Sequence, residues 1–240
     1  MKQKLEAGRD GSRVGPVKIL VLTGFMFAVP AGVLFLAAGT WKWPMAWAYL
    51  GVTAVFGLAT RLLALKKNPD LLQERASGLG KKDVASWDRK LMPLTAMAGP
   101  LVLLGLAGMD KRLGWSDRVP DILVAAALVV LVLGCLIGLG ATVVNRYFSA
   151  VVRIQTDRGQ TVVDAGPYSR VRHPGYAGAV AAYLATPVLL GTLWALVPAL
   201  VIIGLIVLRT ALEDRKLHRE LDNYAEYAQR VRYRLFPGLW

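Results

Sequence analysis

The chain has 240 residues, 55% of them hydrophobic, and it carries 29 Lys and Arg against 16 Asp and Glu, a formal net charge of +13. The charges gather in short blocks between long apolar runs, which excludes an ordinary soluble domain, where charges are spread along the sequence. The blocks lie at the ends of the runs, where membrane orientation and anionic inner-leaflet lipids explain a basic excess, so we infer no nucleic-acid partner.

Apolar runs of about 20 residues are long enough to cross a ~30 Å hydrocarbon core as helices, and the backbone there must satisfy its own hydrogen bonds. The sequence therefore predicts an all-α, polytopic membrane bundle of about six spans. A polar tail is expected at 1–18 and a polar segment with room for a short surface helix at 66–90. The first four spans, within 19–144, are predicted at 19–38, 44–64, 91–109 and 122–144.

The last apolar stretch, 176–208, is predicted to form a hairpin of two short spans. As one helix it would reach about 50 Å at 1.5 Å per residue, too long for one ordinary crossing. Gly191 and Thr192 interrupt it near the middle. With this hairpin, and with both termini in the cytoplasm of a plasma-membrane or inner-membrane protein, the basic residues lie inside, as orientation by positive charge requires. The exceptions in the outer loops are Lys42, Lys111, Arg112 and Arg118.

Small residues in the fourth span indicate close helix packing. Gly134 and Gly138 are four residues apart, a spacing that lets two helix backbones approach, and we expect it to serve packing within the monomer. Cys135, the only cysteine, is expected to be a small packing residue. An interfacial aromatic belt is predicted around the first outer loop from Trp41, Trp43 and Trp47.

Two polar motifs flank the predicted hairpin. Residues 166–176 are Gly-Pro-Tyr-Ser-Arg-Val-Arg-His-Pro-Gly-Tyr, and residues 209–217 are Arg-Thr-Ala-Leu-Glu-Asp-Arg-Lys-Leu. Because a hairpin returns its two ends to one side of the membrane, we expect the motifs to be neighbours in space. This expected convergence is the main reason for predicting a site within 145–240, a region that would also include a C-terminal cytoplasmic helix.

The residue types in both motifs suit a polar ligand. The turn at 166–167 brings Tyr168 to the membrane surface. Pro174 suits the first turn of a helix, which places His173 at the helix start, where free backbone N–H groups favour an anion or a polar ligand edge. Arg209 and Glu213 are four residues apart and therefore share one face of the second helix.

Other interpretations of these residues need no site. Arg209 and Glu213 would also form a helix-surface ion pair, worth a few tenths of a kcal/mol. His173 would then be a solvated residue next to the membrane. Further roles are inner-leaflet anchors for Arg170, Arg172 and Arg209, and interfacial aromatics for Tyr168, Tyr176 and Tyr183.

The order and spacing of the motifs favour a site. They form the pattern Gly-Pro-Tyr-x-x-x-Arg-His-Pro-x-Tyr-x-Gly, a hydrophobic hairpin, Arg-x-x-x-Glu-Asp-x-x-Leu and a Tyr-x-x-Tyr segment. This pattern, which covers about 145–240, resembles the isoprenylcysteine carboxyl methyltransferase family. The wider group includes bacterial phospholipid N-methyltransferases and small-thiol methyltransferases. The first three spans carry no matching motif.

The resemblance implies an S-adenosylmethionine-dependent methyltransferase with a cytoplasm-facing cofactor pocket and no metal, and the chain has no Gly-x-Gly-x-x-Gly dinucleotide motif. It implies that Arg209 faces the methyl acceptor and that Glu213 accepts from cofactor hydroxyl or ammonium groups. His173 is the nearest general base if the acceptor is an amine. The cofactor contacts carried over are Gln160, Thr161, Val162, Val163, Tyr168, His173, Pro174, Gly175, Tyr176 and Glu213. The family often has His at the position of Gln160 and Glu at that of Asp214, and both changes preserve polarity.

A lipophilic acceptor from the bilayer is expected. A prenylcysteine carboxylate is favoured because Arg209 suits one, and a phospholipid amine and a hydrophobic thiol are the alternatives. A sterol-reductase-like protein that binds NADPH would have more spans. A transporter or membrane scaffold is a further hypothesis, which the nearly uncharged spans and the polar motifs at one surface disfavour.

Overall fold

The computed structural model describes residues 16–81 and 83–240, and within these ranges the chain is helical and has no strand. Most of the predicted tail at 1–18 lies outside the described residues. A π-helical turn, Leu94–Ala98, joins α5 to α6. The helices are α2 (Pro16–Ala38), α3 (Pro44–Lys67), α4 (Pro69–Ser77), α5 (Asp88–Pro93), α6 (Gly99–Leu113), α7 (Asp121–Val144), α8 (Pro174–Leu190), α9 (Leu196–Glu220) and α10 (Tyr224–Arg230).

Four of the described helical segments are long and apolar enough to cross a membrane, so the all-α membrane class is confirmed. These segments are Pro44–Lys67, Asp88–Leu113, Asp121–Val144 and Leu193–Glu220. The apolar helix α8 has 17 residues, which reach roughly 25 Å and fall short of the hydrocarbon thickness. The count of six spans therefore stays a prediction.

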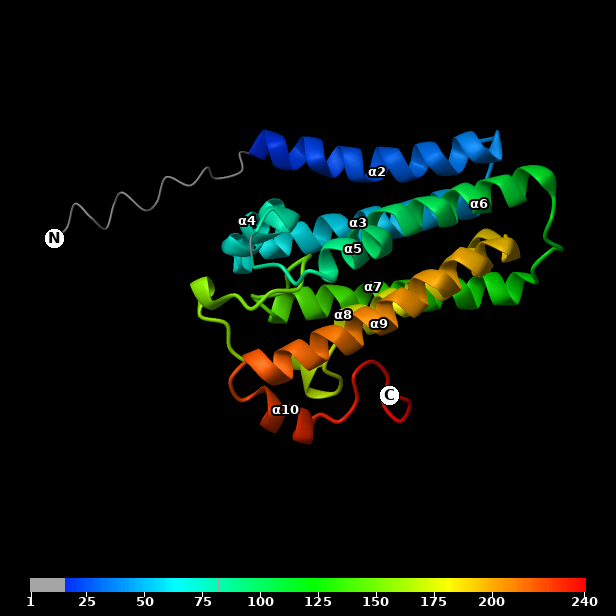
Figure 1. Ribbon diagram of the computed structural model, residues 1–240. Coiled ribbons are helices and arrows are strands. Elements are labelled where there is room, and N and C mark those ends of the chain that lie inside the picture. The colour runs from blue at the N-terminus through cyan, green and yellow to red at the C-terminus, as the bar shows by residue number, and fades with distance from the viewer. Residues whose placement is uncertain (1–15, 82) are drawn as a thin grey trace.

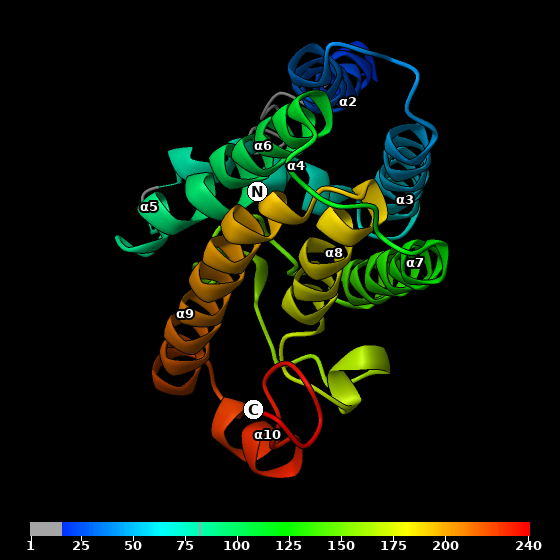
Figure 2. The same ribbon diagram turned by 90° about the vertical axis from the view of Figure 1, so that its right-hand side faces the viewer.

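The long helices run side by side, and their connections alternate between the two ends of the bundle (Figure 1). The loops at 39–43, 114–120 and 191–195 lie at one end. The helix α4, the segment 145–173 and the last turns of α9 lie at the other end, with α10 close by. Viewed along the bundle, α8 lies between α7 and α9 (Figure 2). Three of the segments that the sequence assigned to one side of the membrane, α4, 145–173 and the last turns of α9, thus lie at one end of the molecule.

The predicted break is confirmed, since α8 and α9 form a helical hairpin, although α9 is longer than the short span expected. The helix α8 ends at Gly191, whose φ of +67° lies in the left-handed region that glycine tolerates. Beyond this turn the buried carboxylate of Asp110 accepts hydrogen bonds from the Ser116 hydroxyl (2.6 Å) and the Trp194 N–H (3.2 Å). The hydroxyl of Ser116 in turn accepts from the Leu193 N–H at 2.7 Å. This cluster ties the hairpin turn to the loop after α6.

The helices α7 and α8 pack through glycines, which confirms close packing within the monomer. A Cβ at Gly134 would lie only 2.6 Å from the carbonyl oxygen of Gly178 on α8. No atom lies within 4 Å of a Cβ built at Gly138, so the two glycines of the motif differ in their surroundings. Cys135 is half-buried and packs against the cluster that includes Leu131 and Leu189, as expected of a packing residue.

The tryptophans of the predicted belt do not all face outward. Trp41 and Trp47 are exposed, but Trp43 is buried, and the Lys111 ammonium lies 5.8 Å from its ring. The interpretation of Trp43 as an interfacial residue was wrong, because its ring belongs to the buried core cluster that includes Leu34 and Leu104.

The glycine contact predicts different effects for two alanine substitutions in α7. Gly134→Ala should destabilise the protein by about 1–3 kcal/mol, because the new methyl group overlaps a backbone carbonyl that cannot rotate away. Gly138→Ala is the matched control and should be neutral or slightly stabilising. Thermal unfolding in detergent measures both, and equal melting temperatures for the two variants would contradict the packing described.

Candidate functional site

A cavity of about 330 Å³ lies between the start of α8, the C-terminal half of α9, α10 and the segment 145–163. This volume is within the range of small-molecule sites, about 300–1,000 Å³. The two motifs on either side of the hairpin both contribute to its wall. The predicted convergence of residues 166–176 with the helix that contains Arg209 is therefore confirmed.

Most of the predicted site residues line this one cavity. Pro174 does not line it and is instead buried at the first position of α8, where its missing N–H costs no helical hydrogen bond. The predicted residues that line the cavity are Gln160, Thr161, Val162, Val163, Tyr168, His173, Gly175, Tyr176, Arg209 and Glu213.

Tyr176 connects the two motifs directly. Its hydroxyl donates a hydrogen bond to Glu213 Oε2 at 2.6 Å, and the guanidinium carbon of Arg209 lies 5.3 Å from the centre of its ring. A cation over the face of a tyrosine ring is attracted by the ring quadrupole. Tyr176 thus holds both polar residues of α9 against the start of α8.

Arg209 pairs with Asp88, and the predicted surface ion pair between Arg209 and Glu213 is wrong. Arg209 Nε and Nη2 lie 2.6 and 3.1 Å from the two carboxylate oxygens of Asp88, and Nη2 also donates to the Ala150 carbonyl at 2.8 Å. Asp88 is 0% exposed and accepts a further hydrogen bond from the Val152 N–H at 2.7 Å. No motif in the sequence pointed to Asp88, which lies 121 residues before Arg209 in a segment of mixed charge.

Asp214 is the centre of a second buried cluster. Arg172 Nε and Arg234 Nε each lie 2.8 Å from its carboxylate, and the Tyr224 hydroxyl donates to it at 2.9 Å. His173 Nε2 lies 3.3 Å from the same carboxylate. Both Arg172 and His173 are buried, so their interpretation as a lipid anchor and a solvated residue was wrong.

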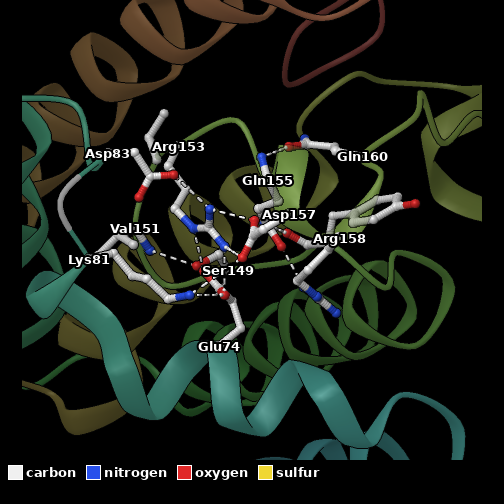
Figure 3. Close-up of polar contacts among 12 residues, drawn as sticks. Glu74, Lys81, Asp83, Ser149, Val151, Arg153, Gln155, Asp157, Arg158 and Gln160 are labelled. Atoms are coloured by element: carbon white, nitrogen blue, oxygen red, sulfur yellow. Dashed lines mark hydrogen bonds and ion pairs between the residues drawn. The ribbon is translucent and has the colours of Figure 1, made fainter. Parts of the chain in front are cut away.

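The remaining wall is built by Arg153, which joins α4 and the following segment to residues 145–163 (Figure 3). The buried guanidinium of Arg153 holds Glu74 bidentately at 2.7 and 2.8 Å, and it also binds Asp83 at 2.7 Å and Asp157 at 2.9 Å. Hydrogen bonding to Arg153 lowers the pKa of the Glu74 and Asp157 carboxyl groups. No motif pointed to these residues.

Three buried tyrosines, Tyr168, Tyr224 and Tyr227, also line the cavity. The Tyr227 hydroxyl donates to the Tyr168 carbonyl at 2.7 Å, and Asn145 donates its side-chain N–H to the Tyr168 hydroxyl at 3.1 Å. Burial raises the pKa of Tyr168, Tyr224 and Tyr227 above the ordinary value of 10.0. These phenols are therefore neutral at physiological pH and present hydrogen-bonding and aromatic surface.

The sequence comparison assigns a family to the cavity-forming region. Residues 125–219 match the family described as Isoprenylcysteine carboxyl methyltransferase (ICMT) family. This region, which is about two fifths of the chain, is similar to that family. No curated protein matches the chain. The match to isoprenylcysteine carboxyl methyltransferases ends before Tyr224 and begins after Asp88 and Glu74, so part of the cavity wall and its ion-pair partners lie outside it.

The similarity to a methyltransferase family and the four long apolar helices together point to an integral membrane protein. Within residues 16–81 and 83–240, no group of three His, Cys, Asp or Glu side chains is arranged to hold a metal ion.

The Arg153 cluster predicts a strong dependence of stability on Glu74. Glu74→Gln should cost about 3 kcal/mol, because it removes a fully buried charge partner. Asp83→Asn should cost less than about 1 kcal/mol, because Asp83 is half-exposed. Thermal unfolding in detergent at pH 7 compares them, and equal losses would contradict the arrangement in Figure 3.

The stability that the Arg153–Glu74 ion pair contributes should depend on pH in one direction. Arg153 lowers the pKa of Glu74 below its ordinary value of 4.5. The ion pair therefore stabilises the fold fully above pH 4.5, and this stabilisation is lost as the pH falls through the lowered pKa. The difference in melting temperature between wild type and Glu74→Gln should therefore shrink only in acid.

Proposed function

We propose that the protein transfers a methyl group from S-adenosylmethionine to a lipophilic acceptor that reaches the cavity from the bilayer. The observation that supports this most is the convergence of Tyr176, Arg209 and Glu213 on one cavity within the region matched to the isoprenylcysteine carboxyl methyltransferase family. The cavity is proposed to face the cytoplasm of a plasma or inner membrane, with both termini on the same side, because the basic segments lie at this end.

The residues present fit the methyl donor. Tyrosine rings and Val162 give apolar surface for a purine, and the segment 160–163 provides backbone polar groups beside it. Glu213 receives one hydrogen bond from Tyr176, and among the described residues no Lys, Arg or His lies within 4 Å of its carboxylate. Its second oxygen is therefore available to ribose hydroxyls or an ammonium group.

The chain contributes alignment to the reaction. When bound, S-adenosylmethionine supplies a methyl group on a positively charged sulfur: the acceptor lone pair forms the new bond as the carbon–sulfur bond breaks and its electrons stay on sulfur. Holding two reactants in line can supply about 7–11 kcal/mol. In this proposal Glu213 orients the donor, and Arg209 faces the acceptor. An amine or thiol acceptor must also lose a proton, and His173 in the cavity wall is the candidate base.

Three acceptor groups are compatible with this chemistry. The family resemblance favours the carboxylate of a prenylated cysteine, and the amine of a phospholipid headgroup and the thiol of a small hydrophobic molecule are the alternatives. Anionic inner-leaflet lipids are proposed to surround the basic end of the bundle.

Donor binding tests the role of Glu213. Glu213→Gln should weaken S-adenosylhomocysteine binding about tenfold to a hundredfold, because it removes a charged hydrogen-bond acceptor. Glu220→Gln is the matched control, since Glu220 lies two turns further along α9 and pairs with the partly exposed Lys216. Isothermal titration calorimetry in detergent measures both affinities, and a Glu213→Gln variant that binds like wild type would refute the assigned role.

Turnover tests the function itself. Purified protein in lipid nanodiscs, supplied with methyl-labelled S-adenosylmethionine, should label one of a prenylcysteine, phosphatidylethanolamine or a prenyl thiol. Arg209→Lys should keep donor affinity within about threefold and lower kcat/KM at least tenfold, because a lysine cannot reproduce the two-pronged pairing and the remaining N–H donor. Failure of the wild type both to bind the donor and to label any acceptor would contradict the proposal.

A further inference from the structure

The cations that line the cavity are all paired with carboxylates. Arg209 is paired with Asp88 and Arg172 with Asp214, each through two nitrogen–oxygen contacts of 3.1 Å or less. Arg153, the third arginine in the lining, is paired with three carboxylates. No lysine belongs to the described lining. Asp214 is shared between Arg172 and Arg234, whereas Arg209, the residue proposed to face the acceptor, has the carboxylate of Asp88 to itself.

The pairing of Arg209 is rigid on both sides. Asp88 is completely buried and accepts from the Val152 N–H as well as from Arg209, so separating it from Arg209 would leave a buried charge unpaired. Arg209 is fixed by Asp88, by the Ala150 carbonyl and by the ring of Tyr176. What the acceptor meets is a neutral ion pair.

One nitrogen of Arg209 still reaches the cavity. Nε and Nη2 are used by Asp88 and Ala150, and no described residue accepts a hydrogen bond from Nη1. Nη1 is not among the buried atoms without a partner, and Arg209 lines the cavity, so this N–H group is accessible from it. It offers a directed hydrogen bond without a net positive charge behind it.

We infer that Asp88 determines the acceptor class: by neutralising Arg209, it makes the site favour an acceptor whose reacting group carries no negative charge when it binds, a headgroup amine or a thiol, over a carboxylate. The inference rests on the proposed methyl transfer and departs from the acceptor that the family resemblance favours. Asp88 acts through Arg209 and is a specificity-determining positioning residue. It lies outside residues 125–219, so a chain of this family could keep the matched region and still change its acceptor.

Matched acceptors in nanodiscs test this inference. N-acetyl-S-farnesylcysteine, farnesyl thiol and phosphatidylethanolamine are offered to the wild type with labelled S-adenosylmethionine. The better substrate of farnesyl thiol and phosphatidylethanolamine should have a kcat/KM at least tenfold higher than that of N-acetyl-S-farnesylcysteine, the carboxylate. A wild type that favours the carboxylate overturns the inference and leaves the proposed methyl transfer intact.

A variant separates charge from shape. Asp88→Asn keeps the size of the side chain but leaves the charge of Arg209 uncompensated, and it should shift the ratio of kcat/KM values about tenfold towards the carboxylate. Asp70→Asn, an exposed position on α4, is the control and should leave the ratio unchanged. Binding of S-adenosylhomocysteine checks that the variant keeps its cavity.

The outcomes are distinct. An unchanged ratio in a variant that binds S-adenosylhomocysteine overturns the inference. If Asp88→Asn does not fold, the preference of the wild type decides the matter alone. A wild type that neither binds S-adenosylhomocysteine nor labels any acceptor overturns the proposed function, and the inference with it.

Discussion

The candidate site depends on one buried carboxylate, that of Asp214. Its partners come from three parts of the chain: Arg172 and His173 ahead of α8, Tyr224 on α10, and Arg234 near the C-terminus. A buried charge is costly unless it is paired and hydrogen-bonded, so each of these segments is held where its donor meets Asp214. These contacts join the start of α8 to α9, α10 and the C-terminal segment, and the cavity lies beside them.

The N-terminal and C-terminal halves of the chain contribute different residues to the cavity wall. The region matched to the isoprenylcysteine carboxyl methyltransferase family supplies the hairpin, Arg209 and Glu213. The segment before the third apolar helix supplies Asp88 and Glu74, which compensate Arg209 and Arg153. Each arginine of this wall is paired with a carboxylate, while Glu213 has no cationic partner among the described residues, an arrangement that suits a positively charged donor.

Much of this was predictable from the sequence because it depends on length and order. The break at Gly191 and the return of the two motifs to one end follow from run lengths and charge blocks, and the lining residues from Gln160 to Glu213 follow from the family resemblance. The partners of Arg209 and Arg153 were not predictable, because an ion pair between residues 121 or 79 positions apart leaves no local signal. The spacing of Arg209 and Glu213 suggested a pair that Asp88 and Tyr176 prevent. Span number also remained open, since α8 is short.

The central claim is that the motif before α8 and the helix α9 enclose the methyl-donor site. A structure of the full chain in nanodiscs with S-adenosylhomocysteine bound tests it most directly. The ligand should lie between the segment 160–163 and Tyr176, with its ribose or amino group on Glu213. Ligand density at another place in the bundle, or residues 166–176 separated from α9, would contradict the account.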